Sequence, residues 1–155
     1  MPRQDITMTS EEIEAFLSEG WNLQVATVGT DGWPHLTTLW YTIDNGLIVF
    51  RSFSRSQRIV NLRRDPRLTV LVETGATYEE LRGVMVRGRA ELSNERAQVL
   101  KAYGAIAAKY QFGGNPLDPE VIEALFGGHA DKNTVVTIHP EHTTSWDHRK
   151  LGGRY

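Results

Sequence analysis

The sequence predicts a mainly β fold, a β-barrel or sandwich with helices at its periphery. Asn45-Gly46 is its strongest hairpin signal, because both residues tolerate a positive φ and apolar residues follow them. Residues 84–92 alternate small or apolar side chains with arginines and a glutamate, as a strand with one buried face does. Helical patterns interrupt the hairpins without following every strand, which favours antiparallel pairing. A six-stranded barrel is the most economical version, since closure removes the sheet edges.

The N-terminal half reads as one helix followed by hairpin strands. Thr9 or Ser10 can cap the helix, whose apolar residues recur at helical spacing and which Gly20 ends. A turn at 30–32 and the Asn45-Gly46 turn separate the first strands. The expected strands of this half cover residues 22–28, 35–43, 47–53 and 68–73.

The C-terminal half continues with a strand over residues 84–92 and a helix over 94–110, for which Ser93 is the expected cap. Asp118 followed by Pro119 predicts a second helix that reaches Phe126 and stops at a Gly-Gly pair. The last strand is expected over 133–139, broken at Pro140 and completed by 142–147. Repeats, linkers and low-complexity segments are not evident, so residues 1–155 are predicted to form a single domain.

Bulk properties restrict the class of protein. An apolar content of 40% and a charged content of 23% are typical of soluble globular proteins. The chain has no apolar run long enough for a transmembrane helix and no apparent signal peptide, so neither a membrane partner nor secretion is expected. The absence of cysteine excludes disulfides, thiolate nucleophiles and cysteine-bound metals. These properties are compatible with the cytoplasm, which is the expected location.

The charge is concentrated in one segment. Residues 51–67 contain six arginines and one aspartate, a net charge of +5 in a chain whose formal total is −2. Ser54 or Ser56 can cap a short helix that ends before Pro66, and a helix start with hydroxyls and arginines favours phosphate. A solvated basic helix above Ile59 and Leu62 is the simpler alternative. A nucleic-acid backbone is the nearest rival ligand, although a near-neutral total charge argues against a dedicated nucleic-acid binder.

Other motifs for chemistry are weak. His139 and His142 have a loose metal-ligand spacing, but Pro140 prevents a helical arrangement, and no metal site is predicted. Motifs for nucleotide-binding loops or an acyl-transfer nucleophile are absent. Trp40-Tyr41 on a threonine-rich strand offers a flat face for a planar ring. The residues therefore indicate a barrel that binds a planar, phosphorylated ligand, and they identify no catalytic residue.

These segments together resemble one known family. The order ATVGTDGWPHLTTLWY, NGLIVFRS, RIVNLRRDPRLTVLV, RGVMVRGRAEL and SWDHRKLGG is similar to the pyridoxamine 5′-phosphate oxidase-like split-barrel superfamily, from about Trp21 to Gly153. Within it, the chain most resembles the F420-dependent branch of the flavin/deazaflavin oxidoreductases, the B-type group. The resemblance implies an FMN-binding-type split β-barrel that forms a homodimer, with two cofactor grooves at the dimer interface.

The resemblance also implies which residues hold the cofactor. Arg58 takes the place of the basic residue that binds the cofactor phosphate, and Arg55 belongs to the same arginine cluster. Trp146 matches a late aromatic residue that closes the site, often from the other subunit. The complete set of cofactor-binding residues implied in this way is Thr37, Thr38, Leu39, Trp40, Tyr41, Arg51, Ser52, Arg55, Ser56, Gln57, Arg58 and Trp146.

The resemblance departs from the FMN-dependent oxidases at two positions. Thr37 and Thr42 stand where those enzymes carry basic residues, which favours coenzyme F420 over FMN. The expected function is hydride transfer from reduced F420 to a conjugated organic acceptor of the tetrapyrrole, quinone or enone type. An FMN-dependent oxidase-like enzyme and a non-catalytic protein that binds F420, FMN or haem are the alternatives. The expected partners are a small-molecule substrate and a second copy of the chain, with no nucleic acid.

Overall fold

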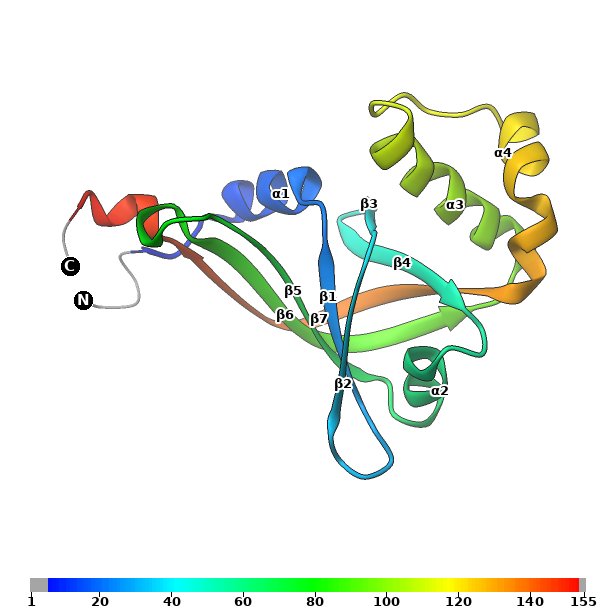
Figure 1. The fold of residues 1–155 in the computed structure, drawn as a ribbon, viewed down its shortest axis with the longest axis horizontal. Coiled ribbons are helices and arrows are strands. Elements are labelled where there is room, and N and C mark those ends of the chain that lie inside the picture. Colours follow the sequence, from blue (N-terminus) through cyan, green and yellow to red (C-terminus); the bar gives the residue numbers. More distant parts are fainter. Residues whose placement is uncertain (1–5, 154–155) are drawn as a thin grey trace.

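A computed structural model describes residues 6–153 and shows a curled antiparallel sheet surrounded by helices (Figure 1). In chain order the elements are α1 (Ser10–Glu19), β1 (Leu23–Val28), β2 (Pro34–Leu39), β3 (Thr42–Asp44), β4 (Leu47–Phe53), α2 (Gln57–Arg64), β5 (Arg67–Thr74), η2 (Tyr78–Glu80), β6 (Arg82–Ser93), α3 (Arg96–Gln111), α4 (Pro119–Phe126), η3 (Gly127–Lys132), β7 (Asn133–Asp147) and η4 (His148–Leu151). The predicted single domain of residues 1–155 extends beyond the described residues at both ends.

The sheet has seven strands in the order β2-β1-β5-β6-β7-β4-β3, with every pair antiparallel. The mainly β, split-barrel prediction is confirmed, but the expectation of six strands is wrong. The extra strand arises because the predicted strand 35–43 is divided: β2 pairs with β1, whereas β3 pairs with β4. These two halves lie at the two edges of the sheet.

Trp40 and Tyr41 are the two residues that separate β2 from β3. The Tyr41 side chain is completely buried, and its hydroxyl donates to the Leu17 carbonyl of α1. Its backbone N–H donates to the Tyr110 hydroxyl at 3.2 Å instead of to a neighbouring strand. Because only two residues connect β2 to β3, the two sheet edges must approach each other here. The sheet is therefore curled into an incomplete barrel.

The Asn45-Gly46 hairpin is confirmed. Both residues have positive φ values, 49° and 76°, and the turn joins β3 to β4 with Asp44 opposite Leu47. A two-residue turn with both φ positive matches the right-handed twist of the strands. The turn returns the chain as β4, in which the partly buried Arg51 and the buried Ser52 are neighbours.

β7 is one continuous strand, although a break at Pro140 was expected. The pairing partner of Pro140 is Gly88, and the register shifts between Arg87 and Gly88, so that a β-bulge absorbs the irregularity. A Cβ atom on Gly88 would lie 2.2 Å from the His139 carbonyl oxygen, which explains why glycine occupies this position. Pro140 is exposed, as expected for a proline in a strand beside a bulge.

The main core lies inside the curl of the sheet. Alternate residues of β1, β5 and β6 point into it, which confirms the alternation expected for residues 84–92. Its completely buried large side chains include Tyr41, Phe50, Leu23 and Ile59. A second, smaller cluster lies between α3, η3 and the sheet and contains Val99, Tyr103 and Val135. The buried clusters thus hold α3 beside β4 and α2 beside β1.

The helices start close to where the sequence predicts. Thr9 and Glu12 form a reciprocal capping box at the start of α1. The arginine-rich helix α2 follows Ser56 and ends at Asp65, as expected. α3 begins later than predicted, after Glu95, while Ser93 ends β6. Within residues 6–153, no helix has the length and apolar character needed to cross a bilayer.

Candidate cofactor site

Two arginines and a group of hydroxyls meet where β2, β4 and α2 come together. Arg58, in the first turn of α2, donates from Nε to the Thr37 Oγ1 of β2 at 3.0 Å. Its NH1 donates to the Ser52 Oγ of β4 at 2.6 Å. The same Ser52 hydroxyl lies 2.9 Å from the Ser56 Oγ. Three elements distant in sequence are thereby joined through a single guanidinium.

The start of α2 has no side-chain cap. Ser56 occupies the N-cap position, but its hydroxyl meets Ser52 and accepts no bond from the first helical N–H groups. The helix also has no acidic residue in its first turn. The N-terminal end of the helix dipole is therefore uncompensated by side chains and attracts an anion.

Arg51 lies beside this group and has two neutral partners. Its NH1 donates to Asn133 Oδ1 at 3.3 Å, and its guanidinium carbon sits 3.7 Å from the centre of the Tyr103 ring. The Nε of Arg51 is buried and has no hydrogen-bond partner among the described residues. A buried donor without a partner is costly, which indicates that a bound acceptor completes its environment.

Neither Arg51 nor Arg58 belongs to an ion pair formed among residues 6–153. Burial lowers the pKa of both guanidinium groups from their ordinary value. The arginines nevertheless keep their charge because their intrinsic pKa is so high. Two half-buried cations with only neutral partners constitute a site for an anion.

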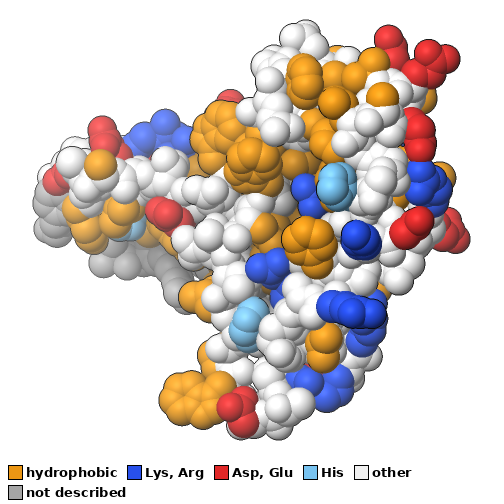
Figure 2. Space-filling view, turned by 45° about the vertical axis from the view of Figure 1, so that its right-hand side comes forward, with side chains coloured by type: hydrophobic (Ala, Val, Ile, Leu, Met, Phe, Trp, Pro, Cys, Tyr) orange, Lys and Arg blue, Asp and Glu red, His pale blue; other side chains and the backbone are white. Residues whose placement is uncertain are grey.

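Both arginines line a pocket of about 220 Å³, which we call the arginine pocket. Its other lining residues are Leu39, Trp40, Ser52, Phe53 and Ile106. Trp40 and Phe53 are exposed at 45% and 60%, so the pocket has an open aromatic rim. Figure 2 shows that Lys and Arg side chains and exposed hydrophobic side chains share this side of the molecule. The pocket can hold a negatively charged group at its base and an apolar ring at its rim.

The structure brings most of the predicted site residues together. Leu39, Trp40, Arg51, Ser52 and Arg58 line the arginine pocket. Thr37 and Ser56 join it through the hydrogen bonds described above. These seven residues come from β2, the segment after it, β4 and the start of α2.

Five of the predicted residues lie elsewhere. Tyr41 is buried in the core, and Thr38 is exposed on the other face of β2 from Thr37. Arg55 and Gln57 are exposed beside the start of α2, where Gln57 Nε2 donates to Asn61 Oδ1 at 2.8 Å. Trp146 lies near the end of β7, opposite Gly83, whereas Asn133 begins that strand. Within one chain Trp146 therefore does not reach the arginine pocket.

Thr42 also lies away from the arginine pocket. It belongs to β3 at the opposite edge of the sheet from β2, and it lines a separate pocket of about 300 Å³ beside α3. Of the two threonines on which the expected preference for F420 depends, only Thr37 meets the arginines. Because Thr42 lies in another pocket, it does not support a preference for F420 over FMN.

A larger cavity, about 660 Å³, lies over β1, β5, β6 and β7. It is lined by Arg67 and Arg87 among others and shares no residue with the arginine pocket. Arg67 is already paired with Asp65 at 2.6 Å. Arg67 and Arg87 are exposed, whereas Arg51 and Arg58 are partly buried and have no acidic partner among residues 6–153, so we take the smaller pocket as the candidate cofactor site.

The histidine motif forms no metal centre in the described part of the chain. His139 Nε2 lies 2.6 Å from a carboxylate oxygen of Glu91, and no group of three metal-ligating side chains gathers among residues 6–153.

Several residues of the site were not anticipated. Asn133 and Tyr103 hold Arg51, and Phe53 and Ile106 line the pocket. Tyr103 and Ile106 lie in the helix expected over residues 94–110, and nothing in the sequence marks them for the site. Asn133 was expected only as the first residue of a strand, and no local signal pairs it with a residue 82 positions away.

The fold and the site together define a split-barrel protein with a pocket in which two arginines lie beside aromatic side chains. The family model of pyridoxamine 5′-phosphate oxidase matches residues 9–147, and the chain belongs to this family, which includes oxidoreductases. A pyridoxine/pyridoxamine 5′-phosphate oxidase of Kineococcus radiotolerans is 35% identical over 82 residues. That match covers 53% of this chain but only 35% of the enzyme's length.

Solved structures give the same fold. A conserved hypothetical protein of Mycobacterium tuberculosis superposes with a TM-score of 0.86 and 37% identity, covering 97% of this chain and 92% of the other. A structure described as an F420 reductase superposes with a TM-score of 0.62 over 84% of this chain and 94% of the other. At 20% identity, this second likeness concerns the fold alone.

Proposed function

We propose that the protein is an F420-dependent reductase of the deazaflavin branch of its family, acting on a conjugated organic acceptor. The pair of half-buried arginines without acidic partners, Arg51 and Arg58, is the observation that carries the proposal. A phosphate is the ligand that such a pair, with nearby hydroxyls and a helix start, binds best.

The residues of the pocket fit the chemical parts of a phosphorylated deazaflavin. Arg58, Ser52 and Ser56 would hold the phosphate, and the unpartnered Nε of Arg51 would donate to an oxygen of the cofactor. The open ring face of Trp40 and the side chain of Leu39 would contact the ring system. When bound, reduced F420 supplies a hydride. The protein positions the acceptor and excludes water.

The preference for F420 over FMN rests on charge. An FMN phosphate carries nearly two negative charges and favours several surrounding cations. Here Thr37 contributes a hydroxyl that accepts from Arg58, where a cation would have added charge. Arg55, Arg63 and Arg64 are exposed on and beside α2, where they can attract the carboxylates of a long flexible tail. The similarity of the fold to that of the F420 reductase structure is consistent with this choice of cofactor.

The complete site requires a second subunit in this proposal. Trp146 is distant from the arginine pocket of its own chain, so its predicted contact with cofactor needs the pocket of a partner. The outward face of β2 exposes Leu36 at 66%, an apolar surface that a dimer would cover. A two-fold homodimer would create two equivalent sites.

Calorimetric titration of the cofactor-free protein with F420 and with FMN tests the proposal. We expect tighter binding of F420, and an affinity that falls between about 50 mM and about 500 mM salt because the exposed arginines contribute. Turnover of menadione by the reduced F420 complex would separate an enzyme from a storage protein. Tighter binding of FMN would contradict the choice of cofactor.

The second candidate is an FMN-dependent oxidase on the same fold. The similarity to the Kineococcus radiotolerans enzyme favours it, and the anion pocket accepts an FMN phosphate as well. Oxidation of pyridoxamine 5′-phosphate by the FMN-loaded protein would establish this candidate.

A further inference from the structure

His35 lies on the face of β2 that carries Thr37. Residues two positions apart on a strand point to the same face, with their Cα atoms about 7 Å apart. His35, Thr37 and Leu39 are the three partly buried residues of β2, whereas the residues between them are exposed. Thr37 accepts the hydrogen bond from Arg58, and Leu39 lines the arginine pocket. The imidazole of His35 is therefore the next side chain beyond Thr37 on the face that meets the arginine.

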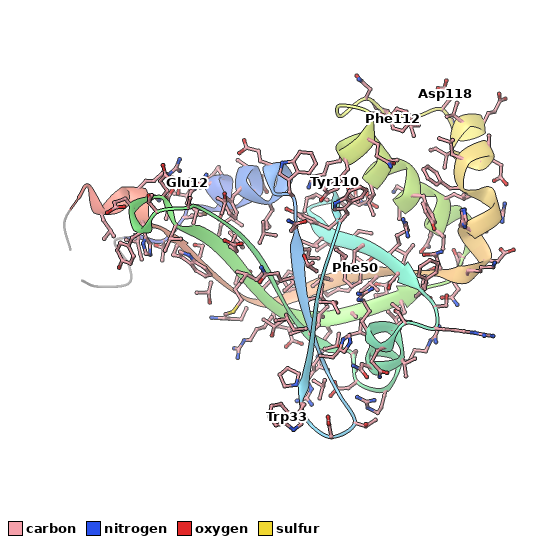
Figure 3. All side chains as sticks on the ribbon, in the orientation of Figure 1. Glu12, Trp33, Phe50, Tyr110, Phe112 and Asp118 are labelled. Atoms are coloured by element: carbon pink, nitrogen blue, oxygen red, sulfur yellow. The ribbon has the colours of Figure 1, made fainter. Side chains whose placement is uncertain are left out.

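Helix α2 packs against this face of the β1–β2 hairpin. His35 is paired with Thr27 of β1, so the two side chains lie on the same face of the sheet. The Thr27 hydroxyl is buried and accepts from Asn61 of α2 at 3.0 Å, and Arg58 precedes Asn61 by three residues. Figure 3 shows Trp33 at the tip of the hairpin, two residues before His35, with α2 next to the hairpin strands. The contacts that aim Arg58 thus surround His35 as well.

One ring nitrogen of His35 has no partner. Its Nδ1 is buried and makes no hydrogen bond to any other residue between 6 and 153, although the residue as a whole is only partly buried. A buried polar nitrogen without a partner costs free energy, and in a native structure it indicates that a partner is missing. The Nε of Arg51 gives the same indication at the pocket itself. A ligand bound beside Arg58 can supply the oxygen that the chain does not.

The charged side chains around His35 come from α2 and from the hairpin turn, because β1 and β2 carry no acidic residue, lysine or arginine. On α2 these are Arg58, Arg63 and Arg64, of which the last two donate to backbone carbonyls. In the turn, Asp31 accepts from a backbone N–H at 3.0 Å. His35 belongs to none of the ion pairs in the described part of the chain. An anion bound at Arg58 is therefore the negative charge to which the imidazole would respond.

We propose that His35 is a further binding residue of this site, and that its imidazole takes up a proton from solvent when a phosphorylated cofactor binds beside Arg58. The inference rests on the proposed function, which places the cofactor phosphate at Arg58. A negative charge roughly 7–10 Å away favours the imidazolium, whose Nδ1 can donate to a ligand oxygen. Because proton and anion strengthen each other's binding equally, the affinity for the cofactor should rise as the pH falls.

Calorimetric titration with oxidised F420 and with FMN, in buffers of different ionisation enthalpy, measures the proton uptake. The ligands can bind protons themselves, so the comparison with His35→Gln isolates the share of the protein: glutamine keeps a polar side chain but takes up no proton. At pH 7 we expect the wild type to take up about 0.2–0.5 more protons per site than His35→Gln. The ratio of the affinities at pH 6 and pH 8 should be about three- to tenfold larger in the wild type.

His142→Gln is the matched control. His142 is exposed and lines the larger cavity, which shares no residue with the arginine pocket, so this variant should keep the proton uptake of the wild type. Nuclear magnetic resonance gives a second readout on the unmodified protein. At pH 7, added ligand should move the ring C–H signal of His35 toward its position in acid. The signal is assigned by its absence in His35→Gln or, if that variant does not fold, by single replacement of the other four histidines.

The outcomes separate this inference from the proposed function. Equal proton uptake by the wild type and His35→Gln, an equal loss in His142→Gln, or a His35 signal that bound ligand does not move would overturn the role of His35. If F420 nevertheless binds and depends on Arg58, the proposed cofactor stands. If FMN binds more tightly and its proton uptake depends on His35, the choice of cofactor is wrong and the role of His35 stands. If neither ligand binds, both proposals are refuted.

Discussion

Arg58 illustrates how one side chain can serve both fold and function. Its guanidinium reaches Thr37 on β2 and Ser52 on β4, and both acceptors are neutral hydroxyls. The charge therefore stays available to a ligand while two hydrogen bonds fix the direction of the side chain. A carboxylate in either position would have held the arginine equally well and neutralised it.

Replacing Arg58 with alanine should weaken cofactor binding by about ten- to hundredfold, because a charge-assisted hydrogen bond contributes roughly 1.5–3 kcal/mol. Thermal unfolding should change little, since the Ser52 hydroxyl keeps Ser56 as a hydrogen-bond partner and Thr37 is only partly buried. Arg87→Ala removes the same charge from the exposed face of β6 and serves as the control. Equal affinities of the wild type and Arg58→Ala, measured by calorimetry, would refute the phosphate assignment.

Lys109 is a cation to which, unlike Arg58, we assign no role in binding a ligand. Its ammonium is buried without a hydrogen-bond partner among the described residues, 3.9 Å from the centre of the Tyr41 ring and 5.0 Å from that of Tyr110. Burial lowers its pKa from 10.5 to about 8. The facing rings favour the ammonium and partly offset this effect. Burial also raises the pKa of both tyrosines, so Lys109 is the group in this cluster that titrates first.

The sign of the pH dependence follows from the lowered pKa of Lys109. Between about pH 8 and 10.5 the unfolded chain binds the proton more tightly, so the free energy of unfolding rises with pH in this window. Because the residue as a whole is only partly buried, we expect a rise of only ~1 kcal/mol. Lys109→Met should remove this rise and stabilise the protein at pH 7. Denaturant unfolding of both proteins at pH 7 and pH 10.5 measures it, and parallel curves would contradict the prediction.

At the scale of elements, α2 owes its position to a buried polar contact as well as to Ile59 and Leu62. Asn61 is completely buried, and its Nδ2 donates to the Thr27 hydroxyl of β1 at 3.0 Å. Its Oδ1 accepts from Gln57 Nε2 at 2.8 Å. This residue fixes the helix against the sheet and thereby aims Arg58 at the pocket.

Asn61→Ala should lower the free energy of unfolding by about 1–3 kcal/mol, because it leaves the buried Thr27 hydroxyl without its donor. Cofactor affinity should fall as well, through the displaced helix. Val60→Ala, at a half-exposed position of the same helix, should change stability by less than about 0.5 kcal/mol. Denaturant unfolding measures both variants. The same stability for Asn61→Ala and Val60→Ala would show that the contact does not anchor α2.

At the scale of the whole molecule, β7 separates two parts of the predicted site. Its first residues lie beside Arg51, and Trp146 near its other end packs flat against Gly83, where a Cβ atom would lie 2.2 Å from the indole. The conformation of Trp146 is thus determined by its own chain. In the proposed dimer, a second chain supplies the pocket that Trp146 closes.

A mixing experiment tests this arrangement. We expect the chain to sediment as a dimer, and Arg58→Ala and Trp146→Ala each to impair cofactor binding. After unfolding and refolding a mixture of the two variants, about a quarter of all sites should regain full affinity, because each mixed dimer has one intact site. A site contained within one chain would give no recovery. A monomer that binds cofactor at full strength would also contradict the dimer.

The sequence by itself determined the parts of this protein that depend on near neighbours. The Asn45-Gly46 turn, a first helix capped by Thr9 (one of the two caps expected) and the arginine helix ended by Asp65 formed as predicted. Each depends on φ preferences or hydrogen bonds among residues a few positions apart, so the local pattern suffices. The resemblance to the family added Arg51, Ser52 and Arg58 as one site, and these residues do line one pocket.

Only the tertiary structure decided what depends on closing the sheet. Residues 35–43 have the pattern of one strand, yet burial of Tyr41 divides them between the two edges, which leaves Thr37 beside Arg58 and places Thr42 in another pocket. The partnership of Arg51 with Asn133 spans 82 positions. Such contacts form only when distant strands pair, and the free energy that selects them comes from burial over the whole molecule.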